Sequence, residues 1–209
     1  MSMKLQINNG RVVDPANKID AVQDVWVADG RIAALGAAPT GFVPDQVIDA
    51  SGLVVAPGLV DLSARLREPG YEYKATLESE LNAALAGGVT TLLCPPDTDP
   101  VLDEPGLVET LKFRAEKLHQ ARVFPQGALT RGLQGETLTE MVELTESGCV
   151  AFGQADVTVA NTQVLQRALQ YASTFGYAVW LRPQDHYLGQ GVAASGALAT
   201  GSSAPPAGS

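Results

Sequence analysis

Short apolar runs alternate with longer amphipathic stretches from Pro57 onward, and this rhythm constrains the fold more than any other feature of the sequence. The runs predict buried strands at residues 59–62, 89–94, 122–124, 149–152 and 177–181. The stretches between them predict helices at residues 76–86, 105–118, 137–146 and 161–173. Each strand and helix together cover about thirty residues, and such alternation calls for a parallel sheet with helices outside it.

Helix 76–86 illustrates the helical pattern, because Leu77, Leu81 and Leu85 recur on one face and Gly87-Gly88 ends the pattern. The alternation of such helices with strands predicts an α/β fold of one of two kinds. One possible fold is a doubly wound sheet. The other is an incomplete (β/α)8 barrel, of which this chain would supply the first five of roughly eight strands.

Residues 1–56 have a different, β-rich pattern. Asp29-Gly30 separates the apolar runs 25–27 and 31–35, and this dipeptide is a strong hairpin signal. We expect a second strand pair between residues 46–49 and 53–55, joined by a turn at Ala50-Ser51-Gly52. The two strand pairs together predict a small sheet or sandwich. The expected organisation is a β-rich portion at 1–56, a partial barrel at 57–188 and a flexible Gly, Ala, Ser and Pro tail at 189–209.

Composition excludes several classes of function. The formal net charge is −9 and the 14 basic residues are scattered, which argues against nucleic acid as a partner. No apolar stretch is long enough to span a membrane. The first ten residues, MSMKLQINNG, do not form a secretion signal, and two cysteines, Cys94 and Cys149, do not make a disulfide framework. A cytoplasmic protein is therefore expected.

Chemistry in a barrel lies at the carboxyl ends of the strands. Four such ends carry polar segments, namely DLSARLREPG (61–70), CPPDTDP (94–100), FGQAD (152–156) and LRPQD (181–185). The run PGLVDLSARLREPG (57–70) resembles the signature of dihydroorotases, the cyclic amidohydrolases of pyrimidine synthesis. The other three segments resemble the second-, fourth- and fifth-strand motifs of the same family, and the likeness extends from about Lys4 to Thr200.

The departures from the family pattern fall on its metal ligands. The resemblance places Ser63 and Arg65 where the family has a His-x-His pair, and Arg182 where it has another histidine. Gln154 stands in the segment that supplies a carboxylate or carboxylated lysine. In the second-strand motif Asp97 replaces an asparagine that helps to hold the substrate, while the sixth- and eighth-strand ligands would lie beyond residue 209.

These replacements are incompatible with a zinc site. Zinc needs neutral imidazole, thiolate or carboxylate donors, whereas arginine has no lone pair to donate and stays protonated. We hypothesise that Arg65 and Arg182 occupy the space of the metal and pair with Asp61, Asp156 or Asp185. No metal or other cofactor is then expected, and a cyclic amide would meet neither a Lewis acid nor an activated hydroxide.

Several side chains have both a functional and a structural interpretation. Arg67 matches the family residue that grips the substrate carboxylate, but it could instead ion-pair within the turn Glu68-Pro69-Gly70, which we favour. We expect His186 to lie on the surface, His119 to close a helix and Cys94 to be a small buried hydrophobe. A rebuilt oxygen-rich metal site at Asp61, Asp156 and Asp185 is less favoured than ion pairing.

The resemblance therefore implies a non-catalytic dihydroorotase homologue. In some bacteria such chains are obligatory companions of aspartate transcarbamoylase, so we expect a structural or regulatory subunit of that enzyme in de novo pyrimidine (UMP) biosynthesis, in a homo- or hetero-oligomer. The alternative is a divergent active dihydroorotase or another cyclic amidohydrolase. A third possibility is a metal-free ligand-binding module that uses Arg67.

The number of strands bears on all three functions. A complete barrel has about eight strands, and the pattern here ends after the fifth. We favour truncation as the explanation, and a frameshifted product or half of an oligomer that completes the barrel are the alternatives. The end of the sequence, GSSAPPAGS, resembles a linker or an artificial terminus.

Overall fold

A computed structural model describes residues 3–184 of the chain. The chain divides into two compact units between Gly58 and Leu59, and each unit is described by itself. Within residues 3–184, every helix is too short or too polar to cross a membrane.

The N-terminal unit consists of two small sheets. One has the strand order β5-β4-β1-β6 and the other the order β3-β2-β7. The strands are β1 (Leu5–Asn8), β2 (Arg11–Asp14), β3 (Ile19–Val22), β4 (Val25–Ala28), β5 (Arg31–Leu35), β6 (Gln46–Asp49) and β7 (Val54–Val55). Val12, Val25 and Trp26 are buried, and the Trp26 indole donates a hydrogen bond to the carbonyl of Gly36 at 2.9 Å.

The hairpin predicted around Asp29-Gly30 is confirmed, because β4 and β5 pair antiparallel and both turn residues have positive φ. The second predicted strand pair is wrong. β6 instead pairs parallel with β1, and β7 pairs parallel with β2 in the other sheet. The turn at Ala50-Ser51-Gly52 therefore passes the chain from one sheet to the other, since partners distant in the sequence outcompete the local hairpin.

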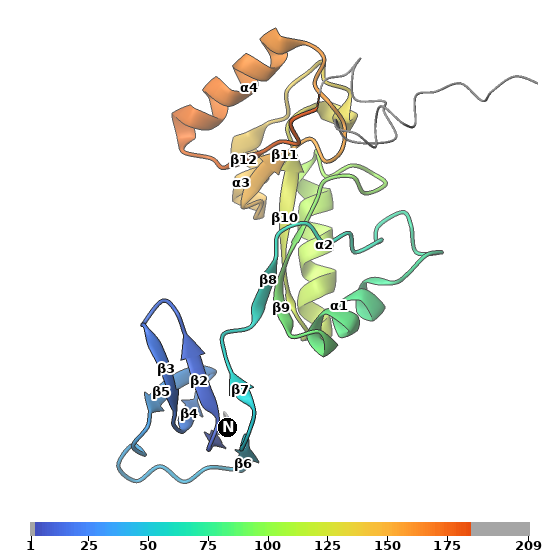
Figure 1. The fold of residues 1–209 in the computed structure, drawn as a ribbon. Coiled ribbons are helices and arrows are strands. Elements are labelled where there is room, and N and C mark those ends of the chain that lie inside the picture. Colours follow the sequence, from blue (N-terminus) through green and yellow to red (C-terminus); the bar gives the residue numbers. More distant parts are fainter. Residues whose placement is uncertain (1–2, 185–209) are drawn as a thin grey trace, which may run out of the picture. The chain divides into compact units, whose positions relative to one another are not determined.

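The second unit contains a curled sheet of five parallel strands in the order β12-β11-β10-β9-β8 (Figure 1). The strands are β8 (Leu59–Asp61), β9 (Val89–Cys94), β10 (Arg122–Ala128), β11 (Ala151–Gly153) and β12 (Val179–Trp180). The predicted alternation and the parallel sheet are confirmed. Each strand neighbours the next one in the sequence, as in a partial (β/α) barrel.

The helices begin and end at residues suited to those positions. They are α1 (Leu77–Ala86), α2 (Pro105–Leu118), α3 (Met141–Ser147) and α4 (Thr162–Phe175), with a short 3₁₀ turn, η1, at Arg131–Leu133. Thr76 caps α1 by accepting a hydrogen bond from the backbone N–H of Ser79, and Asn161 caps α4 in the same way. His119 ends α2 in the left-handed conformation, as the helix-closing interpretation predicts.

One helix begins later than predicted. Residues 137–140 were expected to open a helix, but α3 starts at Met141. Leu138 instead forms an isolated bridge with Thr130, and the Thr139 hydroxyl donates to the carbonyl of Ala128 at 2.5 Å. This segment is therefore tied to the loop after β10, and those tertiary hydrogen bonds override its helical pattern.

Two clusters of buried side chains form the core of the second unit. The first lies between α1, α2 and the strands β9 and β10, and it includes Leu81, Leu92 and Leu111. The second lies between α3, α4 and β11, and it includes Leu144, Phe152 and Ala168. The helices thus bury their apolar faces against the sheet, which leaves the polar carboxyl ends of the strands free to form a site.

We predict that Leu81→Ala lowers the free energy of unfolding by about 2–5 kcal/mol, because its fully buried side chain leaves a cavity behind. Leu85→Ala is the matched control on the same helix, since Leu85 is 41% exposed, and its effect should stay within about 0.5 kcal/mol. Urea unfolding measures both. Equal losses in the two variants would contradict this packing of α1.

Candidate functional site

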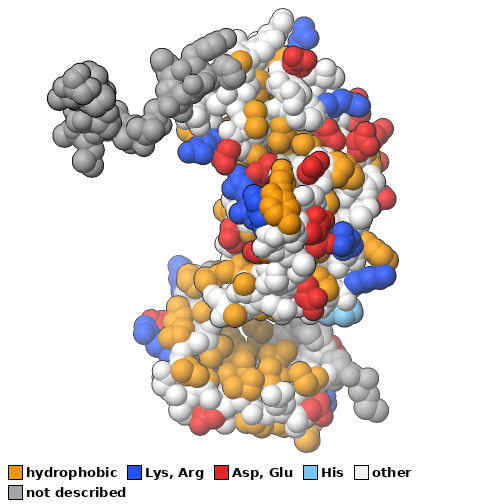
Figure 2. Space-filling view, turned by 90° about the vertical axis from the view of Figure 1, so that its right-hand side faces the viewer, with side chains coloured by type: hydrophobic (Ala, Val, Ile, Leu, Met, Phe, Trp, Pro, Cys, Tyr) orange, Lys and Arg blue, Asp and Glu red, His pale blue; other side chains and the backbone are white. Residues whose placement is uncertain are grey.

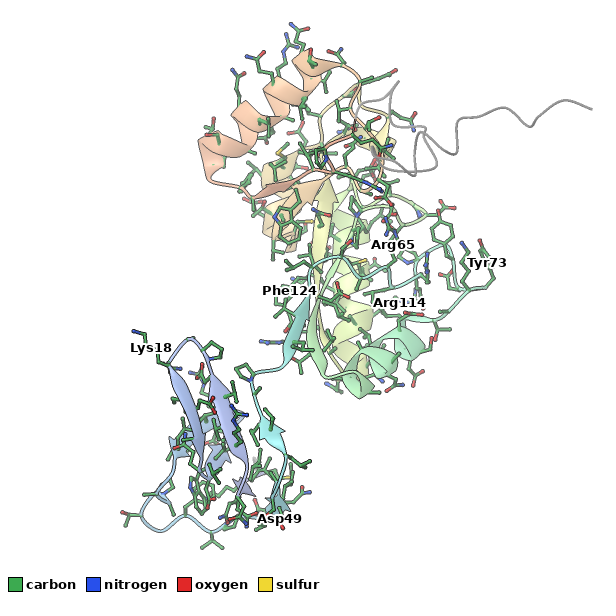
Figure 3. All side chains as sticks on the ribbon, in the orientation of Figure 1. Lys18, Asp49, Arg65, Tyr73, Arg114 and Phe124 are labelled. Atoms are coloured by element: carbon green, nitrogen blue, oxygen red, sulfur yellow. The ribbon has the colours of Figure 1, made fainter. Side chains whose placement is uncertain are left out.

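Arg65 lies at the centre of a charged network at the carboxyl ends of the strands (Figure 3). Its Nε donates to Oδ2 of Asp97, in the loop after β9, at 2.7 Å. One of its terminal nitrogens donates to Oδ2 of Asp156, after β11, also at 2.7 Å. The hydrogen bond to Asp97 is the main cause of a raised Arg65 pKa, so the guanidinium stays charged.

Arg182 extends the network to a fourth strand end. It follows β12, and its Nη1 donates to Oδ1 of Asp156 at 3.0 Å. Asp156 thus accepts hydrogen bonds from both arginines that the sequence resemblance places at expected metal-ligand positions. Asp61 forms no ion pair with an arginine among residues 3–184, and its carboxylate accepts the backbone N–H of Ser63 at 2.9 Å. Asp185, the third expected partner, is outside the described residues.

A cavity of about 200 Å³ adjoins Arg65 and contains the two expected remnants of substrate binding. Arg67 and Asp97 both line it, together with Tyr71 and Lys74. Arg67 adopts a positive φ of 62°, which is uncommon for a residue other than glycine. The cavity therefore joins three cationic side chains to one carboxylate that Arg65 already neutralises.

The interpretation that Arg67 ion-pairs within the turn at residues 68–70 is wrong. Glu68 is 5% exposed and forms its ion pair with Arg114 of α2. Its other oxygen accepts the backbone N–H of Leu77, the first residue of α1, at 2.8 Å. Glu68 therefore fastens the loop after β8 to two helices, while Arg67 makes no ion pair with any residue between 3 and 184.

Gly70 lets this loop approach the loop after β9. A Cβ at Gly70 would collide with the backbone of Asp99, and Gly70 has a φ of 97° that disfavours other residues. The backbone N–H of Asp99 donates to the carbonyl of Pro69 at 3.2 Å. The contact holds the two loops that carry Arg65 and Asp97 side by side.

Gln154 is a buried structural residue rather than a free polar group. It follows β11, is 1% exposed, and its Nε2 donates to the hydroxyl of Thr130 at 2.7 Å. The same hydroxyl accepts the backbone N–H of Gly135 at 2.9 Å. Gln154 thus joins the end of β11 to the loop after β10. The sequence placed it at a ligand position but gave no sign of this partner.

The remaining candidates for metal ligands lie elsewhere or are chemically unsuited. Burial raises the pKa of the Cys94 thiol to about 12, so it is not the thiolate that a metal requires. His119 is exposed at the end of α2 and precedes the start of β10 at Arg122, so it belongs to the amino end of that strand, whereas the network lies at the carboxyl ends. His186 falls outside the described residues.

The side chains at the strand ends do not fit a zinc ion. Ser63 and Arg65 offer no imidazole, and Asp156, a carboxylate close to both arginines, is engaged by their guanidinium groups. Among residues 3–184 there is no group of three His, Cys, Asp or Glu side chains arranged to hold a metal. Of the expected partners, Asp156 pairs with both arginines, and Asp97 is an additional partner of Arg65.

Comparisons with known proteins agree with this architecture. The model of the dihydro-orotase-like family matches residues 52–201. The dihydroorotase-like protein of Pseudomonas putida is 49% identical over 199 residues, which span 95% of this chain and 47% of that protein. The dihydroorotase of Citrifermentans bemidjiense is 43% identical over 202 residues, 95% of this chain and 47% of that one. The chain belongs to the dihydroorotase-like family, and it spans about half the length of these relatives.

Solved structures show the same fold at lower identity. L-hydantoinase from Arthrobacter aurescens superimposes with a TM-score of 0.75 at 21% identity, covering 90% of this chain and 42% of that one. A D-hydantoinase superimposes with a TM-score of 0.62 at 22% identity, covering 88% of this chain and 40% of the other. The partial barrel is therefore shared with these hydrolases.

We predict that Arg65→Met lowers the free energy of unfolding by about 1–2 kcal/mol in dilute buffer, because it removes two partly exposed ion pairs. Salt at 1 M should shrink the loss by screening those pairs in the parent protein. Arg131→Met is the control, since this exposed arginine has no ion pair among the described residues. Urea unfolding at both salt concentrations tests this, and equal stability of the two variants in dilute buffer would refute it.

Proposed function

We propose that this chain is a non-catalytic member of the dihydroorotase-like family whose contribution is structural. The observation that carries the proposal is the ion-pair network of Arg65 and Arg182 with Asp97 and Asp156. A guanidinium can neutralise carboxylates but has no lone pair for a metal. The side chains that would generate a hydroxide for attack on a cyclic amide are replaced by side chains that repel the ion.

The partner that we propose is the catalytic chain of aspartate transcarbamoylase, in de novo pyrimidine biosynthesis. Family membership supports the link with that pathway. A retained barrel framework with altered metal positions supports a role in which the chain offers a surface rather than chemistry. The chain would then hold catalytic subunits of the transferase in a larger assembly, in the cytoplasm.

A divergent active enzyme is the alternative, and relatives such as that of Citrifermentans bemidjiense carry the name dihydroorotase. We expect the purified protein, with zinc added or with a chelator, to hydrolyse dihydroorotate and hydantoin no faster than buffer does. Ultraviolet absorbance of the substrates measures this. The Arg65→Met variant is the control for contamination, since a contaminating hydrolase would act equally in both preparations. Hydrolysis that zinc restores after chelation, and that Arg65→Met changes, would establish the active enzyme instead.

The subunit role predicts a stable complex with aspartate transcarbamoylase. Co-expressed with the transferase from the same organism, the tagged chain should retain it in stoichiometric amount, and gel filtration should show a species larger than the transferase alone. A tag without the chain is the control. Separate elution of the two proteins, with transferase activity the same in the presence and absence of the chain, would contradict the role.

A further inference from the structure

The loop at residues 70–76, between β8 and α1, presents two tyrosines to solvent; we call it the tyrosine loop. Tyr73 is 78% exposed and lies on the part of the loop that projects from the unit (Figure 3). Tyr71 meets it edge to face, with the ring centroids 6.4 Å apart. The ammonium of Lys74 lies over both rings, 5.2 Å from the centroid of Tyr71 and 5.4 Å from that of Tyr73. The three side chains are therefore held together at the surface.

The backbone of the tyrosine loop is ordered by its own hydrogen bonds. The backbone N–H of Gly70 donates to both carboxylate oxygens of Glu72, at 3.1 and 3.0 Å. The N–H of Tyr71 donates to the carbonyl of Arg67 at 2.8 Å, and the N–H of Lys74 donates to the carbonyl of Tyr71 at 2.9 Å. An aromatic side chain on an ordered loop loses little conformational entropy when a partner covers it. The loop is thus suited to binding in the conformation it already has.

The cavity of about 200 Å³ adjoins the tyrosine loop, and it contains a cation without a counter-ion. Tyr71, Lys74 and Arg67 form part of its wall. Arg67 is half-buried and makes no ion pair with any residue between 3 and 184. Asp97, which also lines the cavity, is already paired with Arg65. A half-buried guanidinium has lost part of its hydration, so a carboxylate that enters the cavity would replace what burial removes.

This local charge is opposite to that of the whole chain. The formal net charge is −9, yet three cationic side chains, Arg65, Arg67 and Lys74, meet at one cavity with Asp97. A cationic site on an acidic protein gives an acidic group one preferred place to bind. Figure 2 looks onto the side from which the tyrosine loop projects, and it shows a hydrophobic group next to basic side chains in the second unit.

We infer that the tyrosine loop and the cavity together bind an acidic segment of a protein partner. A carboxylate of that segment pairs with Arg67 inside the cavity, and a neighbouring apolar side chain packs on Tyr73. A small anion would fill the cavity but would not reach Tyr73, which is not among the residues that line it. Tyrosine and arginine often dominate the binding energy of protein interfaces, and arginine clusters recognise acidic motifs. The exposed tyrosine therefore favours a polypeptide as the ligand.

The inference rests on the proposed function, because the partner is taken to be the catalytic chain of aspartate transcarbamoylase. It is tested by measuring the affinity of the chain for the transferase of the same organism by surface plasmon resonance. Tyr73→Ala should weaken binding by roughly tenfold or more, as the loss of an interface hot spot does. Phe113→Ala is the matched control and should leave the affinity unchanged. Phe113 lies on α2, is 57% exposed, and likewise has a lysine over its ring, with Lys117 at 4.2 Å from the centroid.

Two variants of Arg67 test the role of its charge. Arg67→Gln and Arg67→Lys both keep a side chain at the same positive φ, so they share any effect on the backbone and differ in charge. Arg67→Lys should bind the transferase several-fold more tightly than Arg67→Gln in dilute buffer, because it retains the cation for the partner's carboxylate. High salt should remove that difference by screening the pair.

The outcomes separate this inference from the proposed function. A complex in which Tyr73→Ala binds as tightly as the parent would overturn the inference and leave the subunit role standing. Equal affinities of Arg67→Lys and Arg67→Gln in dilute buffer would also overturn it, since the charge in the cavity would then take no part in binding. Absence of any complex between the parent chain and the transferase would contradict the subunit role and this inference together.

Discussion

The bridge from Arg65 to Asp97 and Asp156 is the interaction on which the candidate site depends. It joins three loops that follow different strands, and Arg182 adds a fourth through Asp156. A planar guanidinium can hold two carboxylates in fixed directions. It does so here with both oxygen contacts at 2.7 Å, in a region where Arg65 is only about one-third exposed. The two arginines of the network thus balance the charges of Asp97 and Asp156 from within the chain itself.

The loops around this bridge keep a firm structural framework. The loop after β8 keeps its anchoring, because Glu68 binds both Arg114 and the start of α1, and Gly70 allows contact with Asp99. The cavity beside Arg67 persists as well. Arg65 and Arg182 stand where the sequence resemblance leads us to expect metal ligands, and a guanidinium has no electron pair to donate. The fold alone is therefore a poor guide to activity. The proposed role as a subunit rests on the arginines at the strand ends and on their ion pairs with Asp97 and Asp156.

Much of the fold could be predicted from local patterns. The alternation of buried strands with amphipathic helices fixed the parallel sheet, and Asp29-Gly30 fixed one hairpin. The pairing of β6 and β7 could not be predicted, because their partners β1 and β2 are remote in the sequence. The start of α3 also could not be predicted, because hydrogen bonds to the end of β10 and the loop after it hold residues 137–140 out of the helix.

The site was predictable by residue type but not by partner. Arginine at two positions where the resemblance predicts metal ligands argues against a metal, and Asp156 is among the predicted partners of those arginines. Asp97 as the first partner of Arg65 was missed, although its position after the neighbouring strand β9 was a signal. The sequence gives no sign that Arg114 is the partner of Glu68, because Arg114 lies on α2, far from Glu68 along the chain.

The central claim is that a guanidinium stands where the family would bind a metal ion. The most direct measurement is an anomalous difference map, recorded at the zinc absorption edge from crystals grown with zinc. The account predicts no peak among residues 61–65, 154–156 and 182, with the Arg65 side chain between Asp97 and Asp156. A peak there, with Arg65 turned away from both carboxylates, would contradict it.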